Sequence, residues 1–139
     1  MLLECFWTKF NNHPAPTKVG VTAEESGTYN DFTNINIGGI LPDRSDGVNE
    51  LPYLMLEVMD EIHILQPQGN NQLSRKNPEG FLRAACRVIR KGYGYPSVFN
   101  VDGVFEQMVR CGKRIEDARE GGTSGCVETG AFGTEAYIL

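Results

Sequence analysis

The sequence predicts an α/β fold in which helices alternate with the parallel strands of a sheet. Three observations lead to this prediction: an amphipathic helical pattern over 51–65, a short apolar strand over 96–101, and a second helical pattern over 102–111. Strands and helices that alternate along a chain are typical of α/β domains with parallel strands. The chain has 139 residues, of which 40% are hydrophobic, and this is enough to form the core of one domain.

The first expected element is a helix over the apolar segment LLECFWTKF at the N-terminus. Residues 11–48 follow, and they are rich in Asn, Gly, Pro and Thr with little regular pattern. A segment this long without regular elements is uncommon inside a compact domain, where it is usually functional or disordered. Its aromatic and branched side chains argue against disorder. We therefore expect an ordered segment with short strands near 18–22 and 33–37.

The helix over 51–65 has the clearest pattern in the chain. Its apolar residues recur at steps of three and four, which indicates a helix with one buried face. Pro52 falls in the first turn, where a missing N–H has no cost, and Pro67 ends the helix. The apolar stripe consists of Leu51, Leu54, Met55, Val58, Met59, Ile62 and Leu65.

The next two elements are expected to be a strand and a helix. The segment QLSRK at 72–76 suits a short strand. Asn77 and Pro78 would provide the N-cap and the first position of a helix that runs to Lys91. Gly92 would end that helix, because glycine readily adopts the left-handed conformation found after helix C-termini.

The last part of the chain repeats the alternation. Residues 96–101 (PSVFNV) are expected to form a buried strand, and the helix over 102–111 is closed by Gly112. A short helix, RIEDARE, then leads into the glycine-rich loop at 121–130.

Composition argues against several classes of partner. The chain has 13 Lys and Arg against 18 Asp and Glu, a net charge of -5, and its basic residues do not gather into a run. We therefore expect neither nucleic acid nor membrane as a partner. The apolar stretches are much shorter than the roughly 20 residues that span a bilayer. The N-terminus MLLECFW lacks the basic flank and cleavage site of a signal peptide, so we expect a cytoplasmic protein.

The four cysteines, Cys5, Cys86, Cys111 and Cys126, are widely spaced and form no CxxC pair. This spacing suits neither a zinc site nor a small disulfide framework, and we expect no metal in the chain. Cys86 and Cys111 fall on helical positions, where a free cysteine behaves as a small hydrophobic residue. Both are therefore expected in the core.

The loop GGTSGCVETG at 121–130 surrounds Cys126 with four glycines and places Glu128 two residues later. Reactive cysteines usually depend on a nearby cation or helix N-terminus that favours the thiolate, whereas a carboxylate disfavours it. Three interpretations of Cys126 remain: an inert core cysteine, a disulfide or metal partner, or a thiol whose hydrogen atom is the working part. In extended backbone, Cys126 and Glu128 would face the same side. The glycines would let a substrate or a second loop come close.

Several segments resemble the glycyl radical enzymes of the pyruvate formate-lyase superfamily, and the resemblance covers essentially the whole chain. SGCVETGAFGTEAYIL is similar to the cysteine loop of that family, in which a thiyl radical forms. GTYNDFTNINIGG, DGVNELPYLMLEVMDEIHILQP and KNPEGFLRAACRVIRKGYGYPSVFN resemble segments that precede this loop. Cys-Val-Glu is typical of the dehydratase, decarboxylase and C–N or C–S lyase branches, and the paired cysteines of pyruvate formate-lyase itself are absent.

The resemblance implies a use for the thiol. A glycyl radical would take the hydrogen atom of Cys126, and the thiyl radical would then remove a hydrogen atom from a C–H bond of a small-molecule substrate. In a dehydratase, Glu128 would act as general acid or base at the leaving hydroxyl, a role that depends on burial of its carboxyl group. Asp31 would bind a substrate ammonium or hydroxyl, and Ser26 a substrate carboxylate. Asp and Ser in a loop rich in Asn and Gly also form turns, so a purely structural role is the alternative for both.

The resemblance also implies the wider context of the chain. The fold would be part of a ten-stranded α/β barrel made of two parallel half-barrels. The family carries its radical on a glycine in a C-terminal loop with an Arg-Val-x-Gly-Tyr type motif, which this sequence lacks. Residues 1–139 are therefore interpreted as an internal part of the catalytic domain, with the cysteine loop at 121–130 and without the glycyl radical domain. Such a fragment is expected to be inactive alone. The implied partners of the full-length enzyme are a radical S-adenosylmethionine activating enzyme and a second copy in a homodimer.

Three hypotheses for the function follow. The run from HPAP through NINIGG and the continuation ETGAFG are most similar to the branch that dehydrates trans-4-hydroxy-L-proline. The alternative within the enzymes is the branch that decarboxylates 4-hydroxyphenylacetate, where Glu128 would serve proton transfer on a different substrate. The alternative from another class is a catalytically inactive binding or assembly module.

Overall fold

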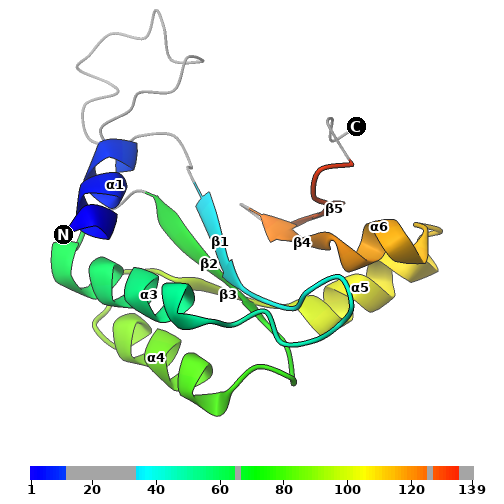
Figure 1. Ribbon diagram of the computed structural model, residues 1–139, viewed down its shortest axis with the longest axis horizontal. Coiled ribbons are helices and arrows are strands. Elements are labelled where there is room, and N and C mark those ends of the chain that lie inside the picture. The colour runs from blue at the N-terminus through cyan, green and yellow to red at the C-terminus, as the bar shows by residue number, and fades with distance from the viewer. Residues whose placement is uncertain (12–33, 65–66, 125–126, 135–139) are drawn as a thin grey trace, which may run out of the picture.

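A three-stranded parallel sheet organises the chain in this computed structural model, which describes residues 1–11, 34–64, 67–124 and 127–134 (Figure 1). The strands lie in the order β1-β2-β3, so that β2 is central. Parallel neighbours need a crossover connection, which is usually helical. The α/β class with parallel strands is confirmed, and the ten-stranded barrel stays a prediction. The strands are β1 (Asn34–Gly38), β2 (Gln68–Leu73) and β3 (Ser97–Asn100).

Two crossover helices cover one face of this sheet (Figure 1). They are α3 (Glu50–Ile62), between β1 and β2, and α4 (Glu79–Ile89), between β2 and β3. The N-terminal helix α1 (Leu2–Asn11) packs against α3 and buries Trp7 completely. The buried core between helices and sheet is apolar and includes Trp7, Ile37, Leu56, Met59, Phe81, Ala85 and Val88.

The predicted helix at 51–65 is confirmed as far as Ile62, but its end at Pro67 was wrong, because the left-handed backbone of His63 already caps the helix. The N-terminus of the helix is explained by its cap. The side chain of Asn49 accepts the N–H of Leu51, which satisfies one of the free donors of the first turn. The apolar stripe is only partly buried, because Leu51 and Leu54 are 46% and 49% exposed. The buried side of α3 consists of Pro52, Leu56, Val58 and Met59.

Two predictions about β2 and α4 were wrong in detail. The strand predicted at 72–76 begins earlier, at Gln68, because the polar run QGNNQL forms the central strand. Asn77 is not the cap of α4: Pro78 occupies that position without a side-chain cap. Asn77 instead accepts the N–H of Ser74 and donates to the carbonyl oxygen of Gly39, so it joins two loops.

The predicted burial of Cys86 and Cys111 was also wrong, since both are exposed. Helix α4 buries the stripe Phe81, Ala84, Ala85 and Val88, and Cys86 lies outside the angular range of that stripe. Cys111 is the C-cap of α5, beyond the last buried turn of that helix. The strand at 96–101 exists as β3, yet it is not fully buried, because Val98 is 45% exposed.

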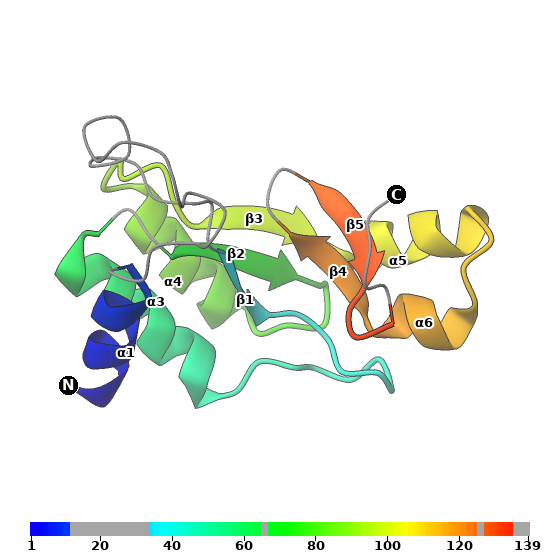
Figure 2. The same ribbon diagram turned by 90° about the horizontal axis from the view of Figure 1, so that it is seen from above.

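The C-terminal part forms two helices and a β-hairpin beside the carboxyl end of the sheet (Figure 2). Asn100 caps α5 by accepting the N–H groups of Asp102 and Gly103. None of the described helices has the length and hydrophobicity that crossing a bilayer requires. These elements are α5 (Val101–Arg110), α6 (Ile115–Arg119), β4 (Gly121–Ser124) and β5 (Glu128–Ala131).

Candidate functional site

The hairpin β4–β5 carries the candidate catalytic residues. Its strands pair antiparallel, from Gly121 opposite Ala131 to Ser124 opposite Glu128. This register ends at the pair of Ser124 and Glu128, so residues 125–127 lie between the two strands in the sequence. Cys126 itself lies outside the described residues.

Val127 closes this loop with an unusual backbone. Its φ is +85°, and its side chain is 66% exposed. Three-residue hairpin loops commonly end with a left-handed residue, which is usually glycine, and a β-branched residue is strongly disfavoured there. The condition of an extended backbone over GCVE is therefore not met at Val127. The rule that residues i and i+2 face the same side does not relate Cys126 to Glu128 here.

Glu128 is the first residue of β5 and is exposed. Its carboxylate makes no ion pair with any side chain in the described part of the chain. The burial that a role as general acid or base would require is not provided by these residues. Asp31 and Ser26, like the strand predicted near 18–22, lie outside the described residues, although Asp31 precedes β1 by three positions in the sequence.

Close packing explains two of the glycines in the cysteine loop. A Cβ on Gly121 would lie 2.9 Å from the carbonyl oxygen of Gly130 and would overlap the end of the Met108 side chain. A Cβ on Gly122 would lie 2.7 Å from the ring of Phe132. These glycines therefore allow β4 to approach α5 and β5, whereas the sequence suggested that they admit a substrate or a second loop.

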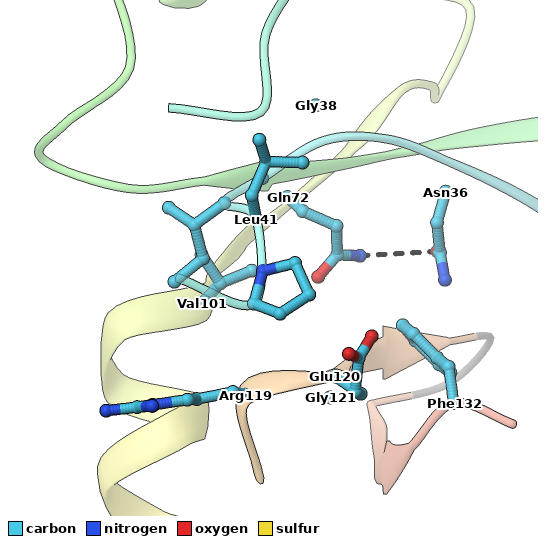
Figure 3. Close-up of a pocket in the computed structure, with 12 residues that line it drawn as sticks. Asn36, Gly38, Leu41, Gln72, Val101, Arg119, Glu120, Gly121 and Phe132 are labelled. Carbon is cyan, nitrogen blue, oxygen red and sulfur yellow. Dashed lines mark hydrogen bonds between the residues drawn. The ribbon is translucent and has the colours of Figure 1, made fainter. Parts of the chain in front are cut away.

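Gln72 attaches the hairpin to the parallel sheet, and sequence reasoning missed it. Its amide nitrogen donates to the carbonyl oxygen of Thr123 at 2.8 Å, and its amide oxygen accepts the N–H of Thr123 at 3.2 Å. The same amide nitrogen lies 3.3 Å from Oδ1 of Asn36, and Figure 3 shows the two amides facing each other. The available signal was the run of amide side chains in QGNNQL, because Asn is depleted in strands and a buried amide needs a partner.

A cavity of about 320 Å³ lies between the end of β1, the start of α5 and the hairpin (Figure 3). It combines apolar walls with a few polar groups, which is the usual character of a small-molecule pocket. Glu128, the one predicted catalytic or substrate-binding residue in the described part of the chain, does not line it. Its lining includes Asn36, Leu41, Gln72, Val101, Arg119, Glu120 and Phe132.

Asp102 fixes the loop that forms one wall of this cavity. Its carboxylate accepts hydrogen bonds from Nη2 of Arg44 at 3.1 Å, from the hydroxyl of Ser74 at 3.0 Å and from the N–H of Arg75 at 3.0 Å. Burial acts to raise the pKa of Asp102. The bonds from Arg75 and Ser74 and the charge of Arg44 outweigh this effect and lower the pKa. The network therefore ties the loop before α3 to the first turn of α5.

Comparisons with known proteins place the whole chain in one family context. The family model described as pyruvate formate lyase-like matches residues 1–139. The chain is 59% identical over 138 residues to trans-4-hydroxy-L-proline dehydratase of Clostridioides difficile, covering 99% of this chain and 18% of that protein. It is 36% identical over 104 residues to the 4-hydroxyphenylacetate decarboxylase glycyl radical subunit of Clostridioides difficile, covering 72% of this chain and 12% of that protein.

A solved structure gives the same result for the fold. The crystal structure of hydroxyproline dehydratase from Clostridioides difficile, with trans-4-hydroxy-L-proline bound, matches with a TM-score of 0.83 and 58% identity. The match covers 99% of this chain and 17% of that chain. The chain therefore spans less than a fifth of the length of the relatives that it matches.

Proposed function

The chain belongs to the pyruvate formate lyase-like family, and from that premise we propose that the full-length protein is a glycyl radical lyase that dehydrates trans-4-hydroxy-L-proline. The observation that carries this proposal is the identity of 59% over 138 residues to a dehydratase of that substrate. The corresponding value for the arylacetate decarboxylase subunit is 36% over 104 residues. The difference favours dehydration over decarboxylation.

The residues of the hairpin fit a thiol that stays protonated. Glu128 borders the loop of Cys126 and pairs with no described basic side chain, so its charge disfavours a thiolate there. When present, the glycyl radical supplies the acceptor for the hydrogen atom of the Cys126 thiol. A metal is not part of this proposal.

The reaction that we propose uses Cys126 as a carrier of a hydrogen atom. Its sulfur takes a hydrogen atom from a substrate C–H bond, so that the S–H bond re-forms and the unpaired electron passes to the substrate carbon. The carboxylate of Glu128 accepts a proton that the substrate loses and passes it to the hydroxyl group, which leaves as water when the C–O bond breaks. The product carbon then takes back the hydrogen atom of the thiol, and both residues end as they began.

Asp31 and Ser26 complete the proposal as substrate-binding residues. Asp31 would pair with the substrate ammonium or hydroxyl, and Ser26 would hydrogen-bond its carboxylate. The family further suggests that residues 1–139 are an internal part of the catalytic domain, that the enzyme is a cytoplasmic homodimer, and that a radical S-adenosylmethionine enzyme activates it.

An activity assay of the full-length, anaerobically activated protein tests the proposal. We expect loss of water from trans-4-hydroxy-L-proline and no release of carbon dioxide from 4-hydroxyphenylacetate. Carbon dioxide from the second substrate would replace dehydration with decarboxylation. No turnover of any substrate, together with no glycyl radical motif in the full-length reading frame, would favour the inactive module instead.

A further inference from the structure

Gln72 joins two parts of the chain that are far apart in the sequence. It lies in the central strand β2, and only 4% of it is exposed. Its amide both donates to and accepts from the backbone of Thr123, at 2.8 Å and 3.2 Å. Two bonds in opposite directions to one residue imitate the pairing between neighbouring strands. The side chain therefore acts as a one-residue extension of the sheet that reaches β4.

Thr123 depends on this partner because its backbone points away from β5. In an antiparallel pair, the N–H and the C=O of one residue point to the same side of the strand. Both groups of Thr123 are bonded to Gln72, so they do not pair with Thr129, the residue opposite. Thr123 is fully buried, and a buried backbone group without a partner is strongly unfavourable.

The same amide also contacts the first strand of the sheet. Nε2 of Gln72 lies 3.3 Å from Oδ1 of Asn36 in β1 (Figure 3). Asp31 precedes β1 by three residues, and Cys126 follows Thr123 by three residues. Gln72 therefore links β1, which follows Asp31 in the sequence, to β4, which precedes Cys126.

We propose that Gln72 is a positioning residue, which through its bonds to Thr123 fixes β4, the strand that leads into the loop of Cys126, against β2 and β1. The proposal rests on the proposed function, because it takes Cys126 as the reacting thiol. Gln72 acts through β4 and is not itself a group that reacts. Hydrogen transfer requires the sulfur to reach one C–H bond closely, and a misplacement of about 1 Å costs on the order of 100-fold in rate.

Three variants of the full-length enzyme test this role. Gln72→Met keeps a side chain of similar length but removes both bonds to Thr123. Gln72→Glu keeps the oxygen that accepts the N–H of Thr123 and replaces the donor by a second oxygen. Asn71→Leu is the matched control, because it changes the next buried residue of the same strand, whose side chain faces the opposite side of the sheet.

The measurements separate positioning from folding. For Gln72→Met, we expect kcat to fall about 10- to 100-fold with little change in KM. Glycyl radical content, measured by electron paramagnetic resonance after activation, should equal that of the wild type. Deuterium uptake should rise in peptides that cover β4 and not in those that cover β1. Asn71→Leu should leave these quantities at their wild-type values.

Gln72→Glu adds a readout that a purely structural role would not produce. A protonated carboxyl group can donate to the carbonyl oxygen of Thr123, whereas a carboxylate cannot. Burial favours the protonated form. The activity of this variant relative to the wild type should therefore recover as the pH falls. If Gln72→Met fails to fold, the pH response of Gln72→Glu tests the proposal in its place. A pH profile of Gln72→Glu identical to that of the wild type would overturn the proposal.

Two other results would overturn it. Unchanged deuterium uptake at β4 in Gln72→Met would overturn the proposal. This result holds for an enzyme of any substrate, because hydrogen exchange does not depend on turnover. Equal losses of activity in Gln72→Met and Asn71→Leu would do so because they would indicate a general weakening of the sheet. An enzyme that fails to dehydrate hydroxyproline but shows the local rise at β4 would support the anchoring and contradict only the proposed function.

Discussion

The guanidinium group of Arg44 lies 3.1 Å from the carboxylate of Asp102 and, at the same time, 4.2 Å from the ring centroid of Phe105. Both charged side chains are only 22% exposed, so the pair is shielded from solvent more than a typical surface ion pair. Arg44 belongs to the loop between β1 and α3, and the other two residues belong to α5. This contact is one of the ties that hold that loop beside the cavity.

Replacing Asp102 by Ala should loosen the loop at 41–48. The change leaves the donors of Arg44, Ser74 and Arg75 without their common acceptor, which should cost about 2–3 kcal/mol in the free energy of local opening. Hydrogen exchange of peptides over 41–48 in the full-length protein measures this. Glu79→Ala is the matched control, because its ion pair with Arg83 is largely exposed and should contribute little. Equal exchange in both variants would contradict the prediction.

The same contacts of Asp102 predict that the local stability of the loop at 41–48 depends on pH. The pKa of Asp102 is lowered from its usual value of 3.8, so its folded-state pKa lies below that of the unfolded chain. The stability that it contributes is present above the unfolded pKa and is lost as the pH falls through the folded pKa. Protection of 41–48 should therefore begin to decrease as the pH falls below this usual value of 3.8. Asp102→Asn should weaken this dependence, and an unchanged acid response would speak against the assignment.

Val127→Gly should not destabilise the hairpin. Glycine adopts positive φ without steric cost, and the relief of about 1–2 kcal/mol offsets the greater freedom of glycine in the unfolded chain, about 0.5–1 kcal/mol. Val98→Gly is the matched control: Val98 is a partly exposed strand residue without positive φ, and its replacement should destabilise β3. Hydrogen exchange measured at the β4–β5 hairpin in Val127→Gly and at β3 in Val98→Gly compares the two effects. A hairpin loosened as much as β3 would show that Val127 is not strained.

Gly121→Ala should destabilise the contact between β4 and its neighbours by about 1–3 kcal/mol. The added methyl group meets the carbonyl oxygen of Gly130, a backbone atom that cannot move aside easily. Gly103→Ala tests a glycine that has room for a methyl group. Gly103 lies in helix α5, and the atom nearest to a Cβ at this position is 3.5 Å away. That change should be neutral or stabilising by up to about 1 kcal/mol. Thermal unfolding of the two variants should therefore shift in different directions.

Of the thiols of Cys126 and Cys86, only that of Cys126 should be required for turnover. In the full-length activated enzyme, Cys126→Ser should abolish turnover while leaving the fold intact, because the O–H bond of serine is too strong to replace the S–H bond in hydrogen transfer. Cys86→Ser should leave kcat and KM near their wild-type values, since Cys86 is exposed on α4. Equal losses of activity in the two variants would refute this division.

Periodicity in the sequence predicted the helices well, because a buried face leaves a repeated apolar pattern. The stripe that contains Val58 and Met59 identified α3, and the residues after Asn100 identified α5. The central strand was placed too late because Asn70, Asn71 and Gln72 are polar yet buried. A strand with amides on both faces has neither the apolar run nor the alternation by which strands are recognised.

The candidate site was predictable only in part. The motif around Cys126 and Glu128 could be found from its residues and its resemblance to a family, whereas its backbone could not. The left-handed conformation of Val127 contradicts the preference of valine, so local rules predict an extended chain instead. The bond between Gln72 and Thr123 joins residues 51 positions apart, and no local pattern reports such a contact.

The described strands form two separate sheets, one parallel with three strands and one antiparallel with two. Because no backbone ladder runs between them, the hairpin can be exchanged between related proteins without resetting the alignment of the parallel strands. A graft that carries 120–134 into a relative would need to preserve only the side-chain link and the packing of the small residues. The hairpin can therefore vary in sequence while the register of the parallel strands stays constant.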